Sequence, residues 1–270
     1  VVQVYLGYKL TRMVLGFGQG GLSRRTKKSP VVTQSADAQH DQVVRSLLNS
    51  NILLMHDEEA FLGYALGVGG SLVLMNRHIF DGLQAHESVS FLKKTSKKNR
   101  FSYTVKVDDL RALHSQTDDL VCVDVAGFHC QNIVHHFADE DLKGTPSFNV
   151  QLTCWNAVDE TVTVEVASGL ARLGRPVRAA SPEGVDYISV NTVEYDIPTE
   201  NGQCGSLLTR IDASRKAKVV GLHAAGGRSG KQGFGIIVSK SFVQEAFAYF
   251  DVPVIQYASN GDIEKHFRFA

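Results

Sequence analysis

The sequence predicts an all-β protein, built as a sandwich or as a pair of barrels. Three observations support this class: many short apolar segments, turn residues between them, and only two stretches with helical spacing. The chain has 270 residues, enough for one large or two small domains with a substantial core. Hydrophobic residues make up 43% of it and charged residues 21%, as in ordinary globular proteins.

The first half of the chain begins with a helical pattern and then changes to strands. Apolar residues at helical spacing predict a helix over 41–55. A hairpin follows, with strands at 60–68 and 71–75 joined by a turn at Gly69 and Gly70. Further strands are expected at 88–92, 101–107 and 120–126, with the basic run 93–100 as a solvated hairpin tip.

The second half follows a polar, turn-rich segment. The expected strands lie at 149–155, 161–167, 186–195, 206–211, 217–224 and 233–238, and a helix is expected at 240–250. These elements predict five regions: an N-terminal extension or linker (1–40), a helix with a first β-barrel (41–137), an inter-barrel linker (138–148), a second β-barrel with a C-terminal helix (149–255) and a C-terminal tail (256–270).

Charge and cysteine content narrow the class of protein. Lys and Arg total 28, as do Asp and Glu, so no global basic field indicates nucleic acid binding. The four cysteines indicate reduced thiols in a reducing compartment. No apolar run approaches the roughly 18 residues of a membrane span, and no signal peptide is evident. The missing initiator Met suggests a fragment or a product cut from a longer chain. The basic run 24–28 predicts a solvated linker, with an RNA-contacting arm as the alternative.

The segment around Cys204 has the composition of a nucleophile turn. Glycines flank the thiol at positions 202 and 205, which favours a tight turn that presents the sulfur. The backbone N–H groups of Gly202, Gln203 and Cys204 can then converge on one point as an oxyanion hole. The alternative, without a catalytic role, is a buried structural thiol.

A thiol nucleophile needs a base and a group that orients the base. His78, in a loop after the strand 71–75, is the candidate base, and Asp119, at the start of an apolar strand, is the candidate orienter. Their order, His78, Asp119, Cys204, is that of chymotrypsin-like triads. Asp118 and, more weakly, Asp124 compete for the orienting role, and a loop histidine without function is the alternative for His78.

A metal site is a further interpretation of the Cys and His residues between 114 and 136. Their spacing does not fit a zinc finger, so we expect no metal and no other cofactor. These residues are His114, Cys122, His129, Cys130, His135 and His136.

With these motifs, residues 55–250 resemble the picornavirus-type 3C and 3C-like cysteine proteases, most of all those of insect-infecting viruses. The resemblance rests on Gly-x-Cys-Gly at Cys204, on Gly-x-His at His223 and on Thr199, five residues before the thiol. It implies two antiparallel six-stranded β-barrels with the site between them. Ser206, where many members have glycine, and the segment 128–133, which lacks the family's basic RNA-binding residues, depart from the pattern.

The resemblance also implies a function. The chain would process a viral polyprotein in the host cytoplasm, cleaving after Gln or Glu, with His223 and Thr199 binding the residue before the scissile bond (P1). A core histidine is the alternative for His223. Two other functions stay open: an RNA-binding module on a protease-like fold, and an esterase or acyltransferase with the same triad.

Overall fold

The computed structural model describes residues 3–5, 36–57, 60–94, 100–158, 161–180, 185–215, 217–227 and 230–253. The basic run 24–28, most of the basic tip at 93–100 and the tail 256–270 lie outside the described residues. So does most of the predicted N-terminal extension, apart from strand β1 (Gln3–Tyr5) and the start of a helix.

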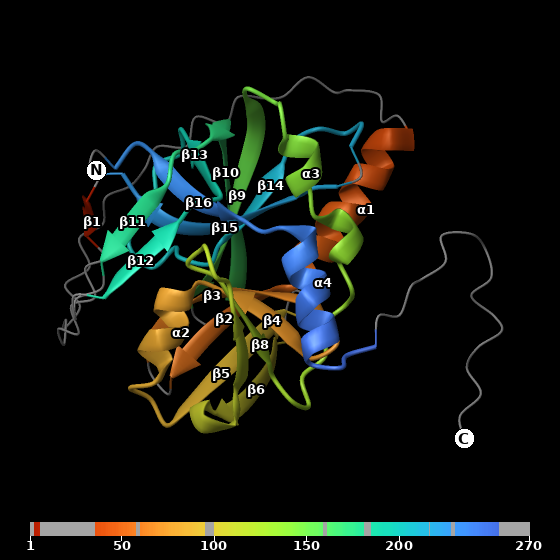
Figure 1. The fold of residues 1–270 in the computed structure, drawn as a ribbon. Helices are drawn as coiled ribbons and strands as arrows, with labels where there is room; N and C mark the ends of the chain where they lie inside the picture. The colour runs from red at the N-terminus through yellow and green to blue at the C-terminus, as the bar shows by residue number, and fades with distance from the viewer. Residues whose placement is uncertain are drawn as a thin grey trace.

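The second half of the chain forms a closed barrel of six antiparallel strands, drawn in the upper part of Figure 1. Around the barrel the order is β10, β13, β16, β15, β14 and β9. The strands are β9 (Phe148–Val158), β10 (Thr161–Leu173), β13 (Thr192–Tyr195), β14 (Leu207–Arg210), β15 (Val219–Gly226) and β16 (Gly233–Ile237).

The first half forms a sheet of seven strands, in the order β6-β5-β2-β3-β4-β8-β7. The strands are β2 (Ile52–Asp57), β3 (Ala60–Gly69), β4 (Leu72–Met75), β5 (Ser88–Lys94), β6 (Arg100–Lys106), β7 (Arg111–His114) and β8 (Val121–Asp124). Within the described residues its end strands β6 and β7 do not pair with each other. The prediction of a second six-stranded barrel was therefore wrong in strand number and in closure.

The error in strand number has a local cause. The first helix, α1, spans Ala36–Ser50 and ends before the predicted 55. The run Ile52–Met55 is buried at four consecutive positions in β2, because the sheet is covered on both faces there. Such a run cannot be told from a buried helix by periodicity alone. Strand β7 was also missed.

Other elements differ from the prediction in detail. The expected strand 186–195 is two strands, β12 (Asp186–Ser189) and β13, separated by a turn. Strand β12 pairs with β11 (Val177–Ala180), which in turn pairs with β1. The remaining elements are the helices α2 (Arg77–Leu83), α3 (Asp139–Leu142) and α4 (Lys240–Tyr249) and the 3₁₀ turns η1 (Val107–Asp109) and η2 (Val134–His136).

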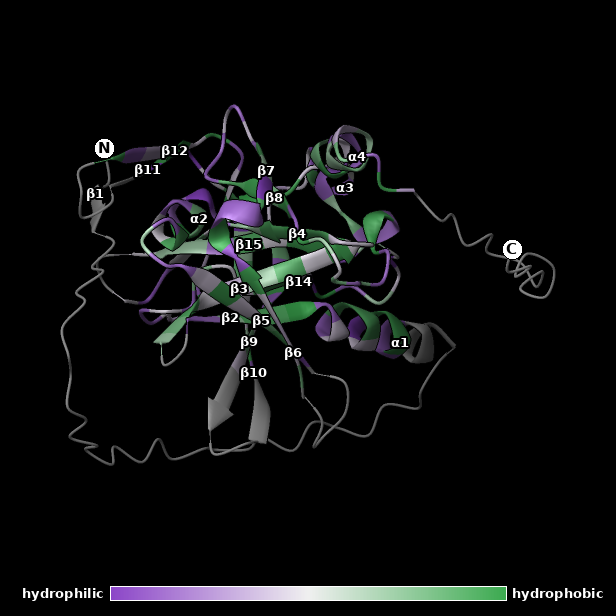
Figure 2. Ribbon diagram, turned by 90° about the horizontal axis from the view of Figure 1, so that it is seen from below, coloured by the Kyte–Doolittle hydropathy of each residue, from purple (hydrophilic) through white to green (hydrophobic). Residues whose placement is uncertain are grey.

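The inner strands β2, β3, β4 and β8 of the seven-stranded sheet are buried over most of their length. One face of the sheet, which carries Phe91, packs on α2 and Phe128. The opposite face shares a core with α1, α4 and the barrel. Strand β4, in the middle of the molecule, is accordingly coloured apolar in Figure 2. Burial of this area is the main favourable term that holds the two halves together.

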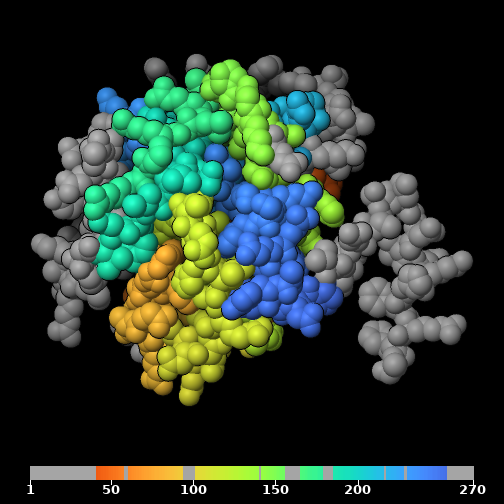
Figure 3. All heavy atoms as spheres, in the orientation of Figure 1, coloured from red at the N-terminus to blue at the C-terminus, as the bar shows by residue number. Residues whose placement is uncertain are grey.

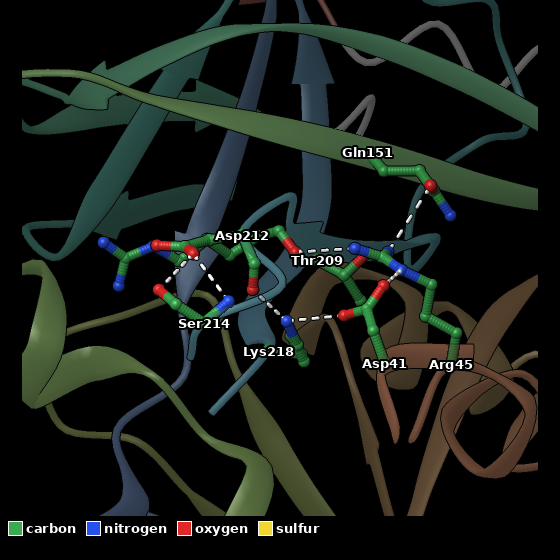
Figure 4. Close-up of polar contacts among 8 residues, drawn as sticks. Asp41, Arg45, Gln151, Thr209, Asp212, Ser214 and Lys218 are labelled. Carbon is green, nitrogen blue, oxygen red and sulfur yellow. Dashed lines mark hydrogen bonds and ion pairs between the residues drawn. The ribbon is translucent and has the colours of Figure 1, made fainter. Parts of the chain in front are cut away.

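A polar cluster fixes α1 to the barrel. Lys218 is only 1% exposed, and its ammonium lies 2.6 Å from Asp41 Oδ1 on α1 and donates to the Asp212 carbonyl oxygen. Arg45 Nε lies 2.7 Å from Asp41 Oδ2, and its guanidinium also donates to the Arg210 carbonyl (Figure 4). The helix is thus held to the barrel by charge as well as by Val44 and Leu48, which enter the shared core.

Helix α4 follows the barrel in sequence but packs on the first sheet. A Cβ at Gly69 would lie 2.7 Å from Phe247, and the Arg111 guanidinium lies 5.3 Å from the centre of the Phe250 ring. Figure 3 shows α4, in blue, against the yellow surface of the first half. The two halves therefore form one packed unit. No helix among the described residues is long and apolar enough to cross a membrane.

Candidate active site

His78 and Asp119 form a buried pair at one edge of the first sheet. His78 lies in the first turn of α2, so the predicted loop was wrong: apolar Ile79, Phe80 and Leu83 on one face make this short segment helical. The ring Nδ1 lies 2.5 Å from Asp119 Oδ2, and the backbone N–H of His78 donates to Asp119 Oδ1 at 2.8 Å. The carboxylate thus fixes both the helix start and the ring.

The competing acids have other partners. Asp118 accepts hydrogen bonds from the backbone N–H groups of Val190 and Asn191, each at 2.9 Å, in the turn between β12 and β13. Asp124 pairs with Arg111 and accepts from the Ser71 hydroxyl at 2.5 Å. Among the three acids considered, Asp119 is the one bonded to the imidazole.

Asp119 is in turn held by the second half of the chain. Its backbone N–H donates to the hydroxyl of Ser189 on β12 at 2.9 Å. Tyr187, on the same strand, lies edge-on to the His78 ring with centroids 6.0 Å apart and donates to Asp81 at 3.0 Å. Strand β12 therefore positions the pair from outside the first sheet.

Cys204 lies on a tight turn between β13 and β14. Gly202 and Gly205 have φ of 89° and 85°, in the region that favours glycine. A Cβ at position 205 would lie 1.9 Å from the Tyr64 carbonyl oxygen, so no larger residue fits there. The Tyr64 N–H also donates to the Cys204 carbonyl at 3.0 Å, which anchors the turn to strand β3.

The amides of this turn differ in availability. The Gln203 N–H donates to the Glu200 carbonyl at 3.4 Å, and the Gln203 side chain accepts from the Glu200 N–H at 3.0 Å. Within the described part of the chain, the N–H groups of Gly202 and Cys204 make no hydrogen bond. These two amides are free to bind an oxyanion, whereas the predicted contribution of Gln203 would require its present bond to break.

The pKa of His78 depends on both Asp119 and Cys204. Burial lowers the pKa of His78, but the charge and hydrogen bond of Asp119, followed by the effect of the nearby Cys204, offset burial and raise that pKa to about 10. The thiol itself donates to the Ala224 carbonyl oxygen at 3.2 Å, and the buried His78 Nε2 has no hydrogen-bond partner. With that pKa the ring holds a proton on Nε2 at neutral pH, and this proton is available to a reacting group.

His223 lies on β15, 1% exposed, beside the nucleophile turn. Burial, followed by the charge of His78, lowers the pKa of His223 to about 3. Its Nδ1 is hydrogen-bonded to the Tyr195 hydroxyl, and burial raises the pKa of that phenol well above its ordinary value. A phenol that keeps its proton donates to Nδ1, which leaves the hydrogen of neutral His223 on Nε2.

Thr199 lies beside β15, the strand that carries His223. Its hydroxyl oxygen is buried without a hydrogen-bond partner, and a Cβ at Gly226 would lie 2.9 Å from it. An unpaired buried hydroxyl costs stability unless a ligand pairs with it. The two residues proposed from sequence for P1 binding thus lie on neighbouring segments.

Tyr195 and Ser189 did not emerge from sequence reasoning. Strand alternation could have found Tyr195, because Val193 and Tyr195 share the buried face of β13 and a buried phenol needs a partner. For Ser189 no local signal exists, since its role depends on the packing of β12 against Asp119. Ser206, the departure from glycine, is fully buried and accepts from the Cys154 thiol at 3.3 Å.

The other thiols and histidines do not form a metal centre. All four cysteines are free. Burial raises the pKa of the thiols of Cys122 and Cys130, the latter to about 12, so neither favours the thiolate that binds metals. Among the residues that the structure describes, no three His, Cys, Asp or Glu side chains could hold an ion together.

Comparison with known proteins supports the class of protein and its fold. A sequence profile of the 3C cysteine protease (picornain 3C) family matches residues 40–228. The fold is similar to that of tobacco etch virus protease in complex with product, with 15% identity, a TM-score of 0.54 and coverage of 76% of this chain and 80% of that chain. Tobacco vein mottling virus protease is similar too, at 15% identity, a TM-score of 0.51 and coverage of 81% and 86%. No curated protein sequence matches the chain.

The fold and the site define a cysteine endopeptidase of the chymotrypsin-like class. More particularly, the chain belongs to the 3C cysteine protease (picornain 3C) family, whose profile spans both halves of the structure.

Proposed function

We propose that this chain processes a viral polyprotein and that Cys204, His78 and Asp119 are its catalytic residues. Cys204 Sγ attacks the scissile carbonyl carbon, and His78 Nε2 holds the thiol proton and returns it to the leaving amine. Asp119 fixes the ring tautomer and stabilises the imidazolium. The N–H groups of Gly202 and Cys204 stabilise the oxyanion, each worth about 3 kcal/mol in comparable sites.

One observation carries the proposal: an imidazole bonded through Nδ1 to a buried carboxylate has its free Nε2 beside a thiol on a glycine turn. A His–Asp pair with only a structural role would not need an imidazole nitrogen that is left without a partner. An esterase would use the same three groups, so the acceptor pocket must decide between the two activities.

The pocket supports Gln or Glu at P1. Neutral His223, with its hydrogen on Nε2, can donate to a side-chain carbonyl oxygen, and the unpaired Thr199 hydroxyl adds a second partner. A site of this kind rejects a side chain that lacks the oxygen, because its own polar groups would then stay unpaired. Fixing the tautomer through Tyr195 is what selects an acceptor.

A peptide library with each residue at P1, analysed by mass spectrometry, tests this function. We expect cleavage after Gln, weaker cleavage after Glu and none after Ala, with no cleavage by the Cys204→Ala variant. Cleavage of simple esters without P1 preference would favour the esterase instead. Cleavage by the Cys204→Ala variant would refute the assigned nucleophile.

Three further parts of the proposal rest on the sequence. Action in the host cytoplasm suits four free thiols, because that compartment is reducing. Origin in a virus of insects and weak RNA binding by the basic segments both stay predictions. A salt-dependent RNA affinity that survives Cys204→Ala would support the second of these.

A further inference from the structure

An exposed aromatic ring lies against the nucleophile turn and takes no part in the proposed chemistry. Phe61, at the start of β3, is 39% exposed. Its Cε1 lies 3.7 Å from the point where a Cβ on Gly202 would stand. An exposed ring this close to the turn is accessible to a substrate that reaches the Cys204 thiol.

The ring is held in place by its neighbours. The Phe61 ring lies edge-on to the Tyr64 ring, with centroids 5.0 Å apart. The ring of His56, on the paired strand β2, lies 5.5 Å from it, centroid to centroid. Tyr64 is itself fixed at both ends: its N–H donates to the Cys204 carbonyl and its hydroxyl to the Trp155 carbonyl. Phe61 is therefore positioned relative to the nucleophile by two residues and one hydrogen bond.

The position of the ring shows which part of a substrate can reach it. The Cys204 thiol donates to Ala224 on β15, next to His223, so the acyl half of a substrate lies on that side. The two halves of a peptide leave the scissile carbon in opposite directions. The amine half therefore runs away from β15, past Gly202, toward the start of β3, where Phe61 lies.

We propose that Phe61 is a specificity residue for the leaving-group side of the substrate. It contacts an apolar, preferentially aromatic, side chain on one of the two residues that follow the scissile bond (P1′ or P2′). Contact between two apolar surfaces removes both from water, and a ring meets another ring favourably edge-to-face. The inference rests on the proposed peptidase function, since it needs a polypeptide that extends beyond the cleaved bond.

Two substrates with the same acyl half separate this role from a structural one. The first is an internally quenched peptide that carries Phe, Leu, Ser or Asp in turn at P1′ and P2′. The second is a peptidyl aminocoumarin, which has no amino acid after the scissile bond. Wild-type enzyme should prefer Phe or Leu at one of the two positions by about ten-fold in kcat/KM, the range that a hydrophobic contact supports.

Phe61→Ala should abolish that preference and lower kcat/KM for the apolar peptide about ten-fold, while turnover of the aminocoumarin stays unchanged. Phe61→Leu should keep most of the preference. Phe101→Ala is the matched control: this ring is similarly exposed, at 46%, but lies on β6, and it should change neither substrate.

Two results would overturn the proposal. An equal loss on both substrates would assign Phe61 to support of the Cys204 turn, and no change on either would show that the ring is idle. Failure of the proposed function has a different signature, because wild-type enzyme would then cleave neither substrate in a Cys204-dependent way.

Discussion

Two clusters of buried charge in this molecule are similar in their contacts and different in what surrounds them. At the site, His78 and Asp119 are each 4% exposed and their side chains lie 2.5 Å apart. Beneath α1, the Lys218 ammonium, 1% exposed, lies 2.6 Å from Asp41. Both join parts of the chain that are far apart in sequence.

The two clusters differ in whether a polar atom is left without a partner. The Lys218 cluster is closed, since the Asp212 carbonyl and Arg45 take up the remaining contacts. The His78 pair is open, because its Nε2 is unpaired and faces the thiol side of the cleft. A buried pair with a perturbed pKa thus indicates catalytic chemistry only where one member has a polar atom without a partner beside a reactive group.

The largest effect should come from the open cluster. Asp119→Asn removes the charge that most raises the pKa of His78, so we expect that pKa to fall and kcat to drop about 10³-fold or more. The high-pH limit of kcat/KM should move to lower pH. A pH–rate profile on the best peptide measures both.

The same variant has a stability signature with a definite sign. The folded pKa of His78, about 10, lies above its ordinary value of 6.5, so the pair stabilises the fold fully below pH 6.5 and loses that contribution as pH rises through 10. Wild-type and variant should differ in urea unfolding at pH 6 and converge above pH 10. Asp124→Asn is the control, and a greater kinetic loss there would move the orienting role away from Asp119.

The closed cluster should affect stability and leave chemistry intact. Asp41→Asn leaves the Lys218 ammonium buried with only a carbonyl oxygen, so we expect about 3 kcal/mol less stability. The double variant Asp41→Asn/Lys218→Met should recover part of this loss. Urea unfolding measures the effect, and kcat of the folded fraction should stay near wild type. A kinetic loss as large as that of Asp119→Asn would make the two clusters equivalent.

The stability difference between wild type and Asp41→Asn should depend on pH in the acid range. Burial raises the pKa of Asp41, but hydrogen bonds and charge from Lys218 and Arg45 offset it and hold the pKa below 3.8. Its contribution is present above pH 3.8 and is lost as pH falls through the lowered value. The stability gap between wild type and Asp41→Asn should therefore close in strong acid.

A smaller effect is expected at the pocket. His223→Ala should lower the preference for Gln over Ala at P1 by about 10²-fold, because the hydrogen bond from the ring is gone. Alkylation of Cys204 by a small electrophile does not need that bond and should change little. Equal losses in cleavage and in alkylation would instead place His223 in the chemistry.

Candidate site residues could be chosen from the sequence more readily than the shape of the first half. Cys204 and His223 lie in local motifs, and His78 and Asp119 were chosen from their order along the chain. Both kinds of signal are present in the sequence without the fold. The seven-stranded sheet has no such signal, because β2 is buried on both faces and carries no alternation. The supports of the site, Tyr195 and Ser189, act across strands that only the fold brings together.

Ser189→Ala is the smallest of these changes and tests whether strand β12, outside the barrel, positions the open cluster. It removes the acceptor of the Asp119 N–H, a bond of 2.9 Å between the halves, and a neutral hydrogen bond is worth about 1 kcal/mol. We expect kcat to fall about five-fold and the high-pH limit of kcat/KM to shift in the direction seen for Asp119→Asn. Ser214→Ala removes a comparable serine contact, with Asp212, far from Asp119, and should leave that limit in place. If Ser189→Ala lowered stability without moving the limit, the first half would hold its proposed catalytic pair without help from strand β12.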